Sequence, residues 1–461
     1  MTGMTESPDN SQTPEPSRHS IRVMSELVFP LILTVAIVLI FLPLFTHLVR
    51  GTATQVPYTD YPAHNIFAAR MRQEHRISMP HPIYHFVVIG TQQLLELTGR
   101  APSPEQFPEP DATTAADMAA TSNEMQGPAL AALNFRYSTA SIYTLLLFYI
   151  FTGLILQSAL RQSLGKPEFT SELINLVLTL CLLIAGPIAL LHSHDQQYYF
   201  GYISSSLWHN PTVLAAKIFA IPVFIGVAGI FENAHRTKRK LEQAMKIAAI
   251  TMLAMLAKPS LVMAMIPAAI VAAAWYFYFR KSFRWNLFAA FLLPAIFLLL
   301  IQAKMYESVN QHSHLQFKPF ATVREMSPGT WGFKLLLSIV FPVACYWLTF
   351  RRGVVCNRLN FAWVTFGFGL CLMYFVAESR RTSHGNLIWS AQLAMYVLFV
   401  ESVRATIEWW RQNQASNPSQ PSFFKMRIAV LVLLFAAHVG YGIAYYLHLQ
   451  SVPITTPLLY M

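Results

Sequence analysis

Long stretches of apolar residues recur along the whole chain, separated by shorter polar segments. A helix needs about 20 mainly apolar residues to cross the hydrocarbon layer of a membrane, because each residue adds about 1.5 Å. The pattern therefore predicts an all-α fold, a polytopic transmembrane helix bundle of about 11 spans. We expect the spans at 27–48, 137–160, 172–192, 211–231, 243–257, 260–279, 286–304, 332–350, 361–377, 387–409 and 428–448.

The first loop, residues 49–136, is the longest polar stretch between two predicted spans. Residues 60–76 repeat apolar positions at helical spacing, which predicts an amphipathic helix lying at the membrane interface. Residues 82–98 form a second apolar piece that can lie at the interface or enter the membrane again. Residues 101–128 are rich in Pro, Ala, Glu and Thr and predict a flexible insertion.

The two ends of the chain differ in character. Residues 1–26 begin with a polar sequence containing Pro, Ser and acidic residues, which predicts a disordered cytoplasmic tail. Residues 27–410 hold ten of the predicted spans and form the expected membrane module. Residues 411–461 are expected to be an inner loop followed by the last transmembrane helix.

Charge sets the expected orientation of the bundle. Only 12% of the residues are charged and 54% are hydrophobic, whereas a soluble domain carries about 25% charged residues. With the N-terminus inside, 19 of the 33 Lys and Arg fall in inner segments and 13 in outer ones. Short inner loops rich in these residues fit the positive-inside rule. They also account for the net charge of +11 without a nucleic-acid partner.

The polar stretch Tyr58–Asn65 follows the first predicted span on the outer side. Asp60 stands just before a Tyr-Pro pair, a common start of a helix, so it can be an N-cap. His64 lies one turn later on the same face. A carboxylate beside it can instead take a proton from an attacking hydroxyl. Asp60 and His64 are therefore the catalytic candidates, with capping as the alternative for Asp60.

The outer segment before the fourth predicted span is rich in His, Tyr and Trp. Asn210 and Pro211 predict the N-cap and the first residue of that helix. The positive end of the helix can hold a phosphate, and the alternative is a well-capped helix with interfacial aromatic residues. His194 and Asp195 are adjacent, which is too weak a pattern to specify a metal site. No cofactor is predicted, and a divalent cation stays an open alternative.

Two further outer segments carry positive charge. Lys258 interrupts two apolar runs, and a lysine at that depth is either functional or extends its ammonium group to the interface. The segment Glu378–Asn386 contains Arg380, Arg381 and His384. Guanidinium groups suit phosphate, and the alternative is a solvated loop held by a Glu–Arg pair.

Taken in order, these segments resemble bacterial multi-spanning glycosyltransferases of the GT-C superfamily, over residues 25 to about 410. The resemblance implies a GT-C-like fold with residues 27–410 as the catalytic module. It also implies a polyprenyl-phosphate-linked sugar as donor and a lipid or polysaccharide as acceptor. The active site would face the periplasm, in the cytoplasmic (inner) membrane of a bacterium. The motifs that carry the resemblance are Asp60 to His64, His81 to His85, Gly201 to Thr212, Lys258 to Ser260, and Glu378 to Asn386 with Trp389.

The resemblance also implies roles for individual residues. Asp60 would be the base of an inverting displacement. The family often shows a second acid nearby, but the next acid of this loop, Glu74, is displaced, so a paired-acid mechanism would depend on Asp195. Cations would stabilise the charge that develops on the leaving phosphate; the candidates are Lys258, Arg380, Arg381, His384 and Asn210. The candidates for the substrate pocket are Tyr84, His85, Asp195, Tyr202, Trp208, His209, Glu378 and Asn386.

Two other functions are compatible with buried charges and a broken helix. A lipid-linked saccharide flippase or transporter would show a two-fold repeat and polar residues at mid-span, and the sequence shows neither. A polysaccharide polymerase or ligase of the outer face would rely on Arg and His in large late loops rather than on Asp60.

Overall fold

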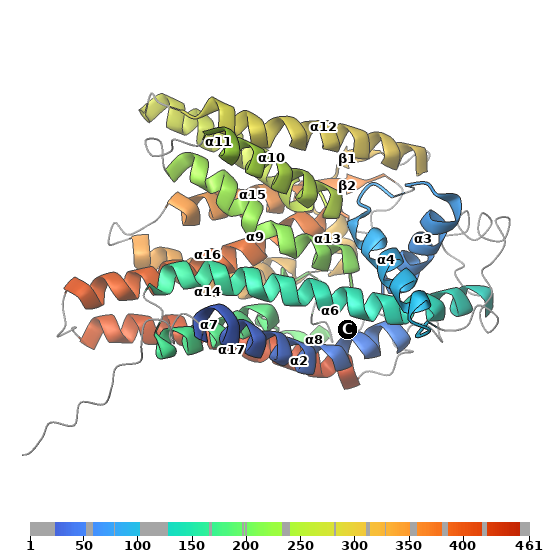
Figure 1. Cartoon of the computed structure of the whole chain (residues 1–461). Coiled ribbons are helices and arrows are strands. Elements are labelled where there is room, and N and C mark those ends of the chain that lie inside the picture. The colour runs from blue at the N-terminus through green and yellow to red at the C-terminus, as the bar shows by residue number, and fades with distance from the viewer. Residues whose placement is uncertain are drawn as a thin grey trace, which may run out of the picture.

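The computed structural model describes residues 24–51, 59–77, 79–101, 128–165, 168–195, 198, 201–232, 240–280, 283–309, 314–327, 329–350, 357–379, 386–416 and 422–451. Within them the fold is all-α, with 15 α-helices, one π-helix and one two-stranded sheet (Figure 1). The elements are η1 (Met24–Val28), α2 (Phe29–Gly51), α3 (Tyr61–Glu74), α4 (Ile83–Leu97), α6 (Pro128–Leu164), α7 (Phe169–Ile184), α8 (His192–Asp195), α9 (Pro211–Glu232), α10 (Lys240–Ala257), α11 (Ser260–Arg280), α12 (Trp285–Val309), β1 (Leu315–Phe317), α13 (Ala321–Met326), α14 (Trp331–Phe350), α15 (Asn357–Phe375), β2 (Val376–Glu378), α16 (Ile388–Ser416) and α17 (Ser422–Ser451).

Seven stretches of helix are long and apolar enough to cross a membrane, and each coincides with a predicted span. The other four predicted spans also form helices, namely α7, α10, α15 and α16. The predicted helices are therefore confirmed, whereas eleven crossings stay a prediction. The predicted span 172–192 is wrong at its C-terminal end, because α7 stops at Ile184. The seven stretches are Glu26–Arg50, Asn134–Leu164, Pro211–Phe231, Ser260–Phe279, Trp285–Glu307, Trp331–Thr349 and Ser422–Ser451.

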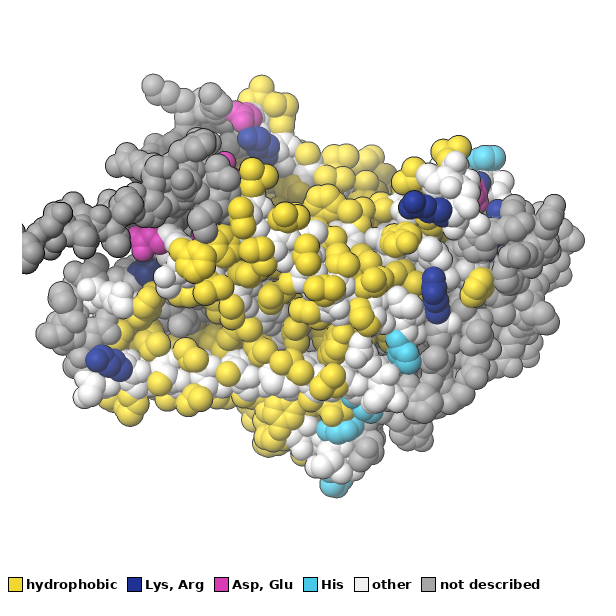
Figure 2. All heavy atoms as spheres, turned by 60° about the horizontal axis from the view of Figure 1, so that its bottom comes forward, with side chains coloured by type: hydrophobic (Ala, Val, Ile, Leu, Met, Phe, Trp, Pro, Cys, Tyr) yellow, Lys and Arg dark blue, Asp and Glu magenta, His cyan; other side chains and the backbone are white. Residues whose placement is uncertain are grey.

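Large apolar side chains cover much of the outside of the bundle. Figure 2 shows one such flank, where hydrophobic side chains form a broad surface and Lys and Arg lie near its margins. Soluble proteins rarely expose an apolar surface of this extent. The fold therefore indicates a multi-pass membrane protein. Among the described residues, Leu31, Leu39, Leu293, Leu300 and Leu433 each expose between 64% and 70% of their surface.

Helices α6 and α16 lie at the centre of the bundle. α6 contacts α2, α3, α4, α7, α9 and α16, and α16 is buried at every residue from 388 to 405. Because its neighbours cover it, α16 can carry charge. Glu401 and Arg404 form a buried ion pair on it, with 2.9 Å between Oε1 and Nη1. This polar content explains why α16 is not among the seven strongly apolar stretches.

The segments that carry the predicted site residues meet at one end of the bundle, on the right of Figure 1, called here the Asp60 end. α3 and α4 pack against each other and against α6 at this end. The last turns of α10 and α12 also reach it. Gln302 in α12 donates from Nε2 to the carbonyl of Met255, at 2.8 Å, and to that of Pro80, at 2.7 Å.

A small antiparallel sheet joins two loops at the same end. β1 pairs with β2, and Leu315 stands opposite Glu378. The sheet brings the segment after α12 beside the segment that leads into α16. Neither strand was predicted, because three residues are too short to show an alternating pattern.

Helix α17 passes very close to the chain that follows α7. The N–H of Gly186 donates to the carbonyl of His438 at 3.0 Å, and His438 Nδ1 lies 2.7 Å from the Gly186 carbonyl oxygen. A Cβ atom added at Gly442 would overlap the carbonyl oxygen of Ile184 and lie 2.9 Å from the nitrogen of Gly186. Only glycine at residue 442 allows this contact between backbones.

We expect Gly442→Ala to lower the free energy of unfolding by about 1–3 kcal/mol, because backbone atoms cannot move aside as a flexible side chain can. Thermal unfolding of the purified protein in detergent measures the change. Gly440→Ala is the matched control in the same helix. A Cβ atom added at Gly440 would meet no atom within 4 Å. Equal melting temperatures for the two variants would contradict the close packing.

Candidate active site

Asp60 occupies the N-cap position of α3, but its side chain does not cap the helix. Instead, Asn210 Nδ2 donates to Asp60 Oδ2 at 2.5 Å. The Asp60 N–H donates to the carbonyl of His209 at 3.3 Å. Backbone and side chain thus both tie Asp60 to the segment before α9. The predicted N-cap position is therefore confirmed, but the Asp60 side chain makes no capping bond to α3.

Asn210 is the N-cap of α9, as the sequence predicts. Its Oδ1 accepts the N–H of Val213 at 3.0 Å and the hydroxyl of Thr212 at 2.8 Å. These two bonds fix which end of the amide is oxygen, so the amide nitrogen must face Asp60. The start of α9 therefore sets the position of the Asp60 carboxylate.

Lys258 completes a chain of contacts with the same helix start. Its Nζ donates to Thr212 Oγ1 at 2.9 Å and lies 5.3 Å from the centre of the Trp389 ring. Burial lowers the pKa of Lys258 to about 8, although the charge of Asp60 opposes this shift. Lys258 therefore remains largely cationic at neutral pH. We call the chain Asp60–Asn210–Thr212–Lys258 the Asp60–Lys258 network.

His64 lies behind Asp60 and contacts α4. Its Nδ1 is 2.9 Å from Nε2 of His85, and both rings are buried. Burial lowers the pKa of His64 well below its usual value and that of His85 to about 3, so both rings are neutral at pH 7. Within the described residues, the ring of His64 bonds to His85 and not to Asp60. Tyr84, which directly precedes His85 in the chain, donates its hydroxyl to Ser141 at 3.1 Å.

Asp195 forms an ion pair with a lysine that the sequence did not single out. Lys334 Nζ lies 2.5 Å from Asp195 Oδ2 and donates to Ser327 Oγ at 2.8 Å. The same ammonium group stands 5.0 Å from the centre of the Tyr202 ring. Asp195 and Tyr202 thus belong to one polar cluster. Within the described residues, no group of three or more His, Cys, Asp and Glu is placed to hold a metal ion.

The remaining pocket candidates fall into different surroundings. Trp208 is fully buried and donates its indole N–H to the Tyr149 hydroxyl at 2.5 Å, which makes it part of the core. Glu378 accepts the hydroxyl of Tyr306 at 2.5 Å and the amide of Asn386 at 2.7 Å. The sheet of β1 and β2 holds this acid in place.

Two of the five phosphate candidates, Lys258 and Asn210, lie in the Asp60–Lys258 network. The other three, Arg380, Arg381 and His384, lie outside the described residues. His209 adjoins the network, with its ring centre 5.6 Å from that of Trp389.

Sequence reasoning missed three residues that connect the candidates. Thr212 joins Asn210 to Lys258, Lys334 neutralises Asp195, and Tyr306 bonds to Glu378. A signal existed for Lys334, which is a lone charge in an apolar run of membrane-spanning length. Nothing in the sequence around Tyr306 marks it.

The fold defines a class of protein: an all-α bundle in which the described part of the chain has seven helices long and apolar enough to cross a membrane. No protein-family model, no curated protein and no solved structure matches the chain. Functional inference therefore depends on the chemistry of the Asp60 end.

Proposed function

We propose that this protein is a membrane glycosyltransferase of the GT-C type. It transfers a sugar from a polyprenyl-phosphate donor to a hydroxyl of a lipid or polysaccharide acceptor, at the periplasmic face of a bacterial cytoplasmic membrane. The observation that supports this most is the Asp60–Lys258 network. It places a carboxylate and a buried cation within one set of contacts, where several helix ends meet.

Asp60 acts as the general base in this proposal. The acceptor oxygen bonds to the anomeric carbon of the sugar while the bond from that carbon to the phosphate oxygen breaks. Asp60 takes the proton of the acceptor hydroxyl. Asn210 occupies Oδ2, whereas Oδ1 of the half-buried Asp60 bonds to no described residue, so it is the oxygen proposed to receive that proton. A single displacement of this kind inverts the anomeric centre.

Lys258 stabilises the phosphate that leaves. Negative charge develops on the departing oxygen, and a preorganised cation in a water-poor site stabilises such charge strongly. Lys258 is 7% exposed, and its bond to Thr212 holds it next to the positive end of α9. Arg380, Arg381 and His384 are proposed as further ligands of the same phosphate.

His64 and His85 have a positioning role in the proposed mechanism. As a neutral pair they join α3 to α4, and α3 begins directly after Asp60. The pair therefore fixes the helix whose start presents the base. Of the pocket candidates, Asp195, Tyr202, His209, Glu378 and Asn386 are proposed to contact the sugar or the acceptor, whereas Tyr84 and Trp208 are fully buried.

The purified protein in lipid nanodiscs provides the test. It is incubated with a panel of isotopically labelled hexosyl and pentosyl polyprenyl phosphates and with glycolipid extracts as acceptor. Mass spectrometry is expected to find free polyprenyl phosphate and a glycosylated acceptor, and NMR of the product is expected to show an inverted linkage. In sealed vesicles, movement of the labelled lipid across the bilayer with its sugar still attached would instead identify a flippase or transporter.

A further inference from the structure

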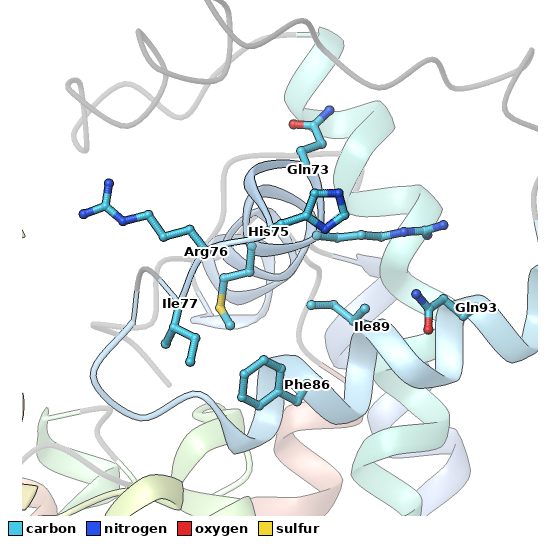
Figure 3. Close-up of a pocket in the computed structure, with 9 residues that line it drawn as sticks. Gln73, His75, Arg76, Ile77, Phe86, Ile89 and Gln93 are labelled. Carbon is cyan, nitrogen blue, oxygen red and sulfur yellow. The ribbon is translucent and has the colours of Figure 1, made fainter.

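A hollow of about 620 Å³ lies between the end of α3 and the start of α4 (Figure 3). None of its lining residues belongs to the Asp60–Lys258 network. Its floor is apolar and consists of Met71, Ile77, Phe86 and Ile89. Ile77 is 51% exposed and Phe86 48% exposed, and Figure 3 shows the two side by side.

The rim of the hollow is basic. Arg72, His75 and Arg76 line it, together with two glutamines. Arg72 is engaged, since its guanidinium group donates two bonds to Glu96, at 2.8 and 2.7 Å. His75 and Arg76 make no ion pair with any described residue. Glu74, the only acid in α3, is paired with Arg70.

The hollow lies level with the ends of the membrane-spanning helices. α4 contacts α6, α9 and α10 near the Asp60 end, and the loop before α4 bonds to the last turns of α12 through Gln302. α3 and α4 have 14 and 15 residues and are too short to cross a bilayer. Helices of this kind lie where phospholipid head groups meet acyl chains.

We propose that the hollow binds an anionic phospholipid. The lipid phosphate lies at Arg76 and His75, and the upper part of an acyl chain covers Ile77 and Phe86. Each half of the site matches one half of such a molecule: His75 and Arg76, which pair with no described acid, for the phosphate, and the exposed side chains of Ile77 and Phe86 for the chain. A soluble phosphate would leave the floor uncovered, and a zwitterionic lipid would bring its own cation to the rim.

This site is additional to the proposed donor and acceptor sites. A lipid bound there would tie the end of α3 to the bilayer, and the start of α3 holds Asp60. The bound lipid would thereby fix the depth of the catalytic carboxylate relative to the membrane.

Native mass spectrometry of the full-length protein tests the site. The protein is released from nanodiscs of mixed phosphatidylcholine and phosphatidylglycerol, and the retained lipids are counted. We expect wild-type protein to retain phosphatidylglycerol selectively. Arg76→Gln should lower retention about fivefold, since each basic residue near a membrane surface contributes about that factor. Adding His75→Gln should lower retention further.

Arg70→Gln is the matched control, because it removes the same charge from the adjoining helix α3, at a residue outside the hollow. Ile77→Asn keeps the charges and should still reduce retention, because it removes part of the apolar floor. Soluble glycerol 1-phosphate should not displace the lipid. Equal retention in Arg76→Gln and Arg70→Gln, equal retention of phosphatidylcholine, or displacement by glycerol 1-phosphate would each overturn the proposal.

Lipid retention is measured without any sugar substrate. Asp60→Asn should leave it unchanged, so the lipid site and the proposed enzymatic function can fail independently.

Discussion

Replacement of Asp60 by Asn is expected to lower kcat for sugar transfer by about 10²- to 10⁴-fold, the range that a general base contributes. The amide cannot take the proton of the acceptor hydroxyl. The local structure should persist, because the amide oxygen can still accept the bond that Asn210 Nδ2 makes to Asp60 Oδ2. Initial rates in nanodiscs at saturating donor measure the loss.

Glu74→Gln is the control for this variant. Glu74 is the last residue of α3 and pairs with Arg70 at the surface, so its replacement should leave the rate unchanged within about twofold. A rate near that of the wild type for Asp60→Asn, in protein that is stably inserted, would show that Asp60 is not the base. The melting temperature of Asp60→Asn separates loss of chemistry from loss of fold.

Lys258 should give the pH–rate profile an alkaline limb. The pKa of Lys258 is lowered to about 8, so the ammonium group is charged below this pH and neutral above it. Because the charged form is the one proposed to bind the donor phosphate, kcat/KM should fall about tenfold per pH unit above pH 8. The phosphodiester of the donor does not titrate in this range, so the limb reports the protein.

Variants at Lys258 identify the source of the limb. Lys258→Arg should move it beyond the measurable range, because guanidinium keeps its charge to about pH 12. Lys258→Met should lower kcat/KM by about 10²- to 10³-fold at pH 7, as expected for loss of one preorganised charge. Lys334 is also buried. Lys334→Arg should leave the alkaline limb of the pH–rate profile near pH 8. A limb that moves in Lys334→Arg but not in Lys258→Arg would contradict the assignment.

The helices could be predicted because their signal is local. Each predicted span coincides with a helix. The break at Lys258 and the N-cap at Asn210 are each predicted by a few adjacent residues. The end of α7 was misplaced, because apolar residues continue past Ile184. Gly186 and Pro187 follow directly, and they are a local signal for a stop. The backbone at the end of α7 then contacts Gly442, which lies far along the chain.

The site was only partly predictable, because its contacts join distant segments. Asp60 and Asn210 are 150 residues apart in the chain, and one sequence cannot show that two such residues touch. Because successive spans cross in opposite directions, the predicted order of spans places Asp60 and Asn210 at the same end of the bundle. This made a contact between them possible. The order of spans could not show that His64 turns toward His85, or that Lys334 meets Asp195.

The Asn210 side chain donates a hydrogen bond to Asp60 and accepts two from the start of α9, which restricts the residue types that can occupy position 210. Of the residues that commonly cap a helix, only Asn has separate donor and acceptor atoms, one facing Asp60 and the other facing the start of α9. An aspartate there would cap equally well but would set a second carboxylate against Asp60. Two carboxylates so close share one proton, which would turn the base into an acid. The stability of α9 and the position of the Asp60 carboxylate thus depend on the same amide, and neither can be adjusted alone.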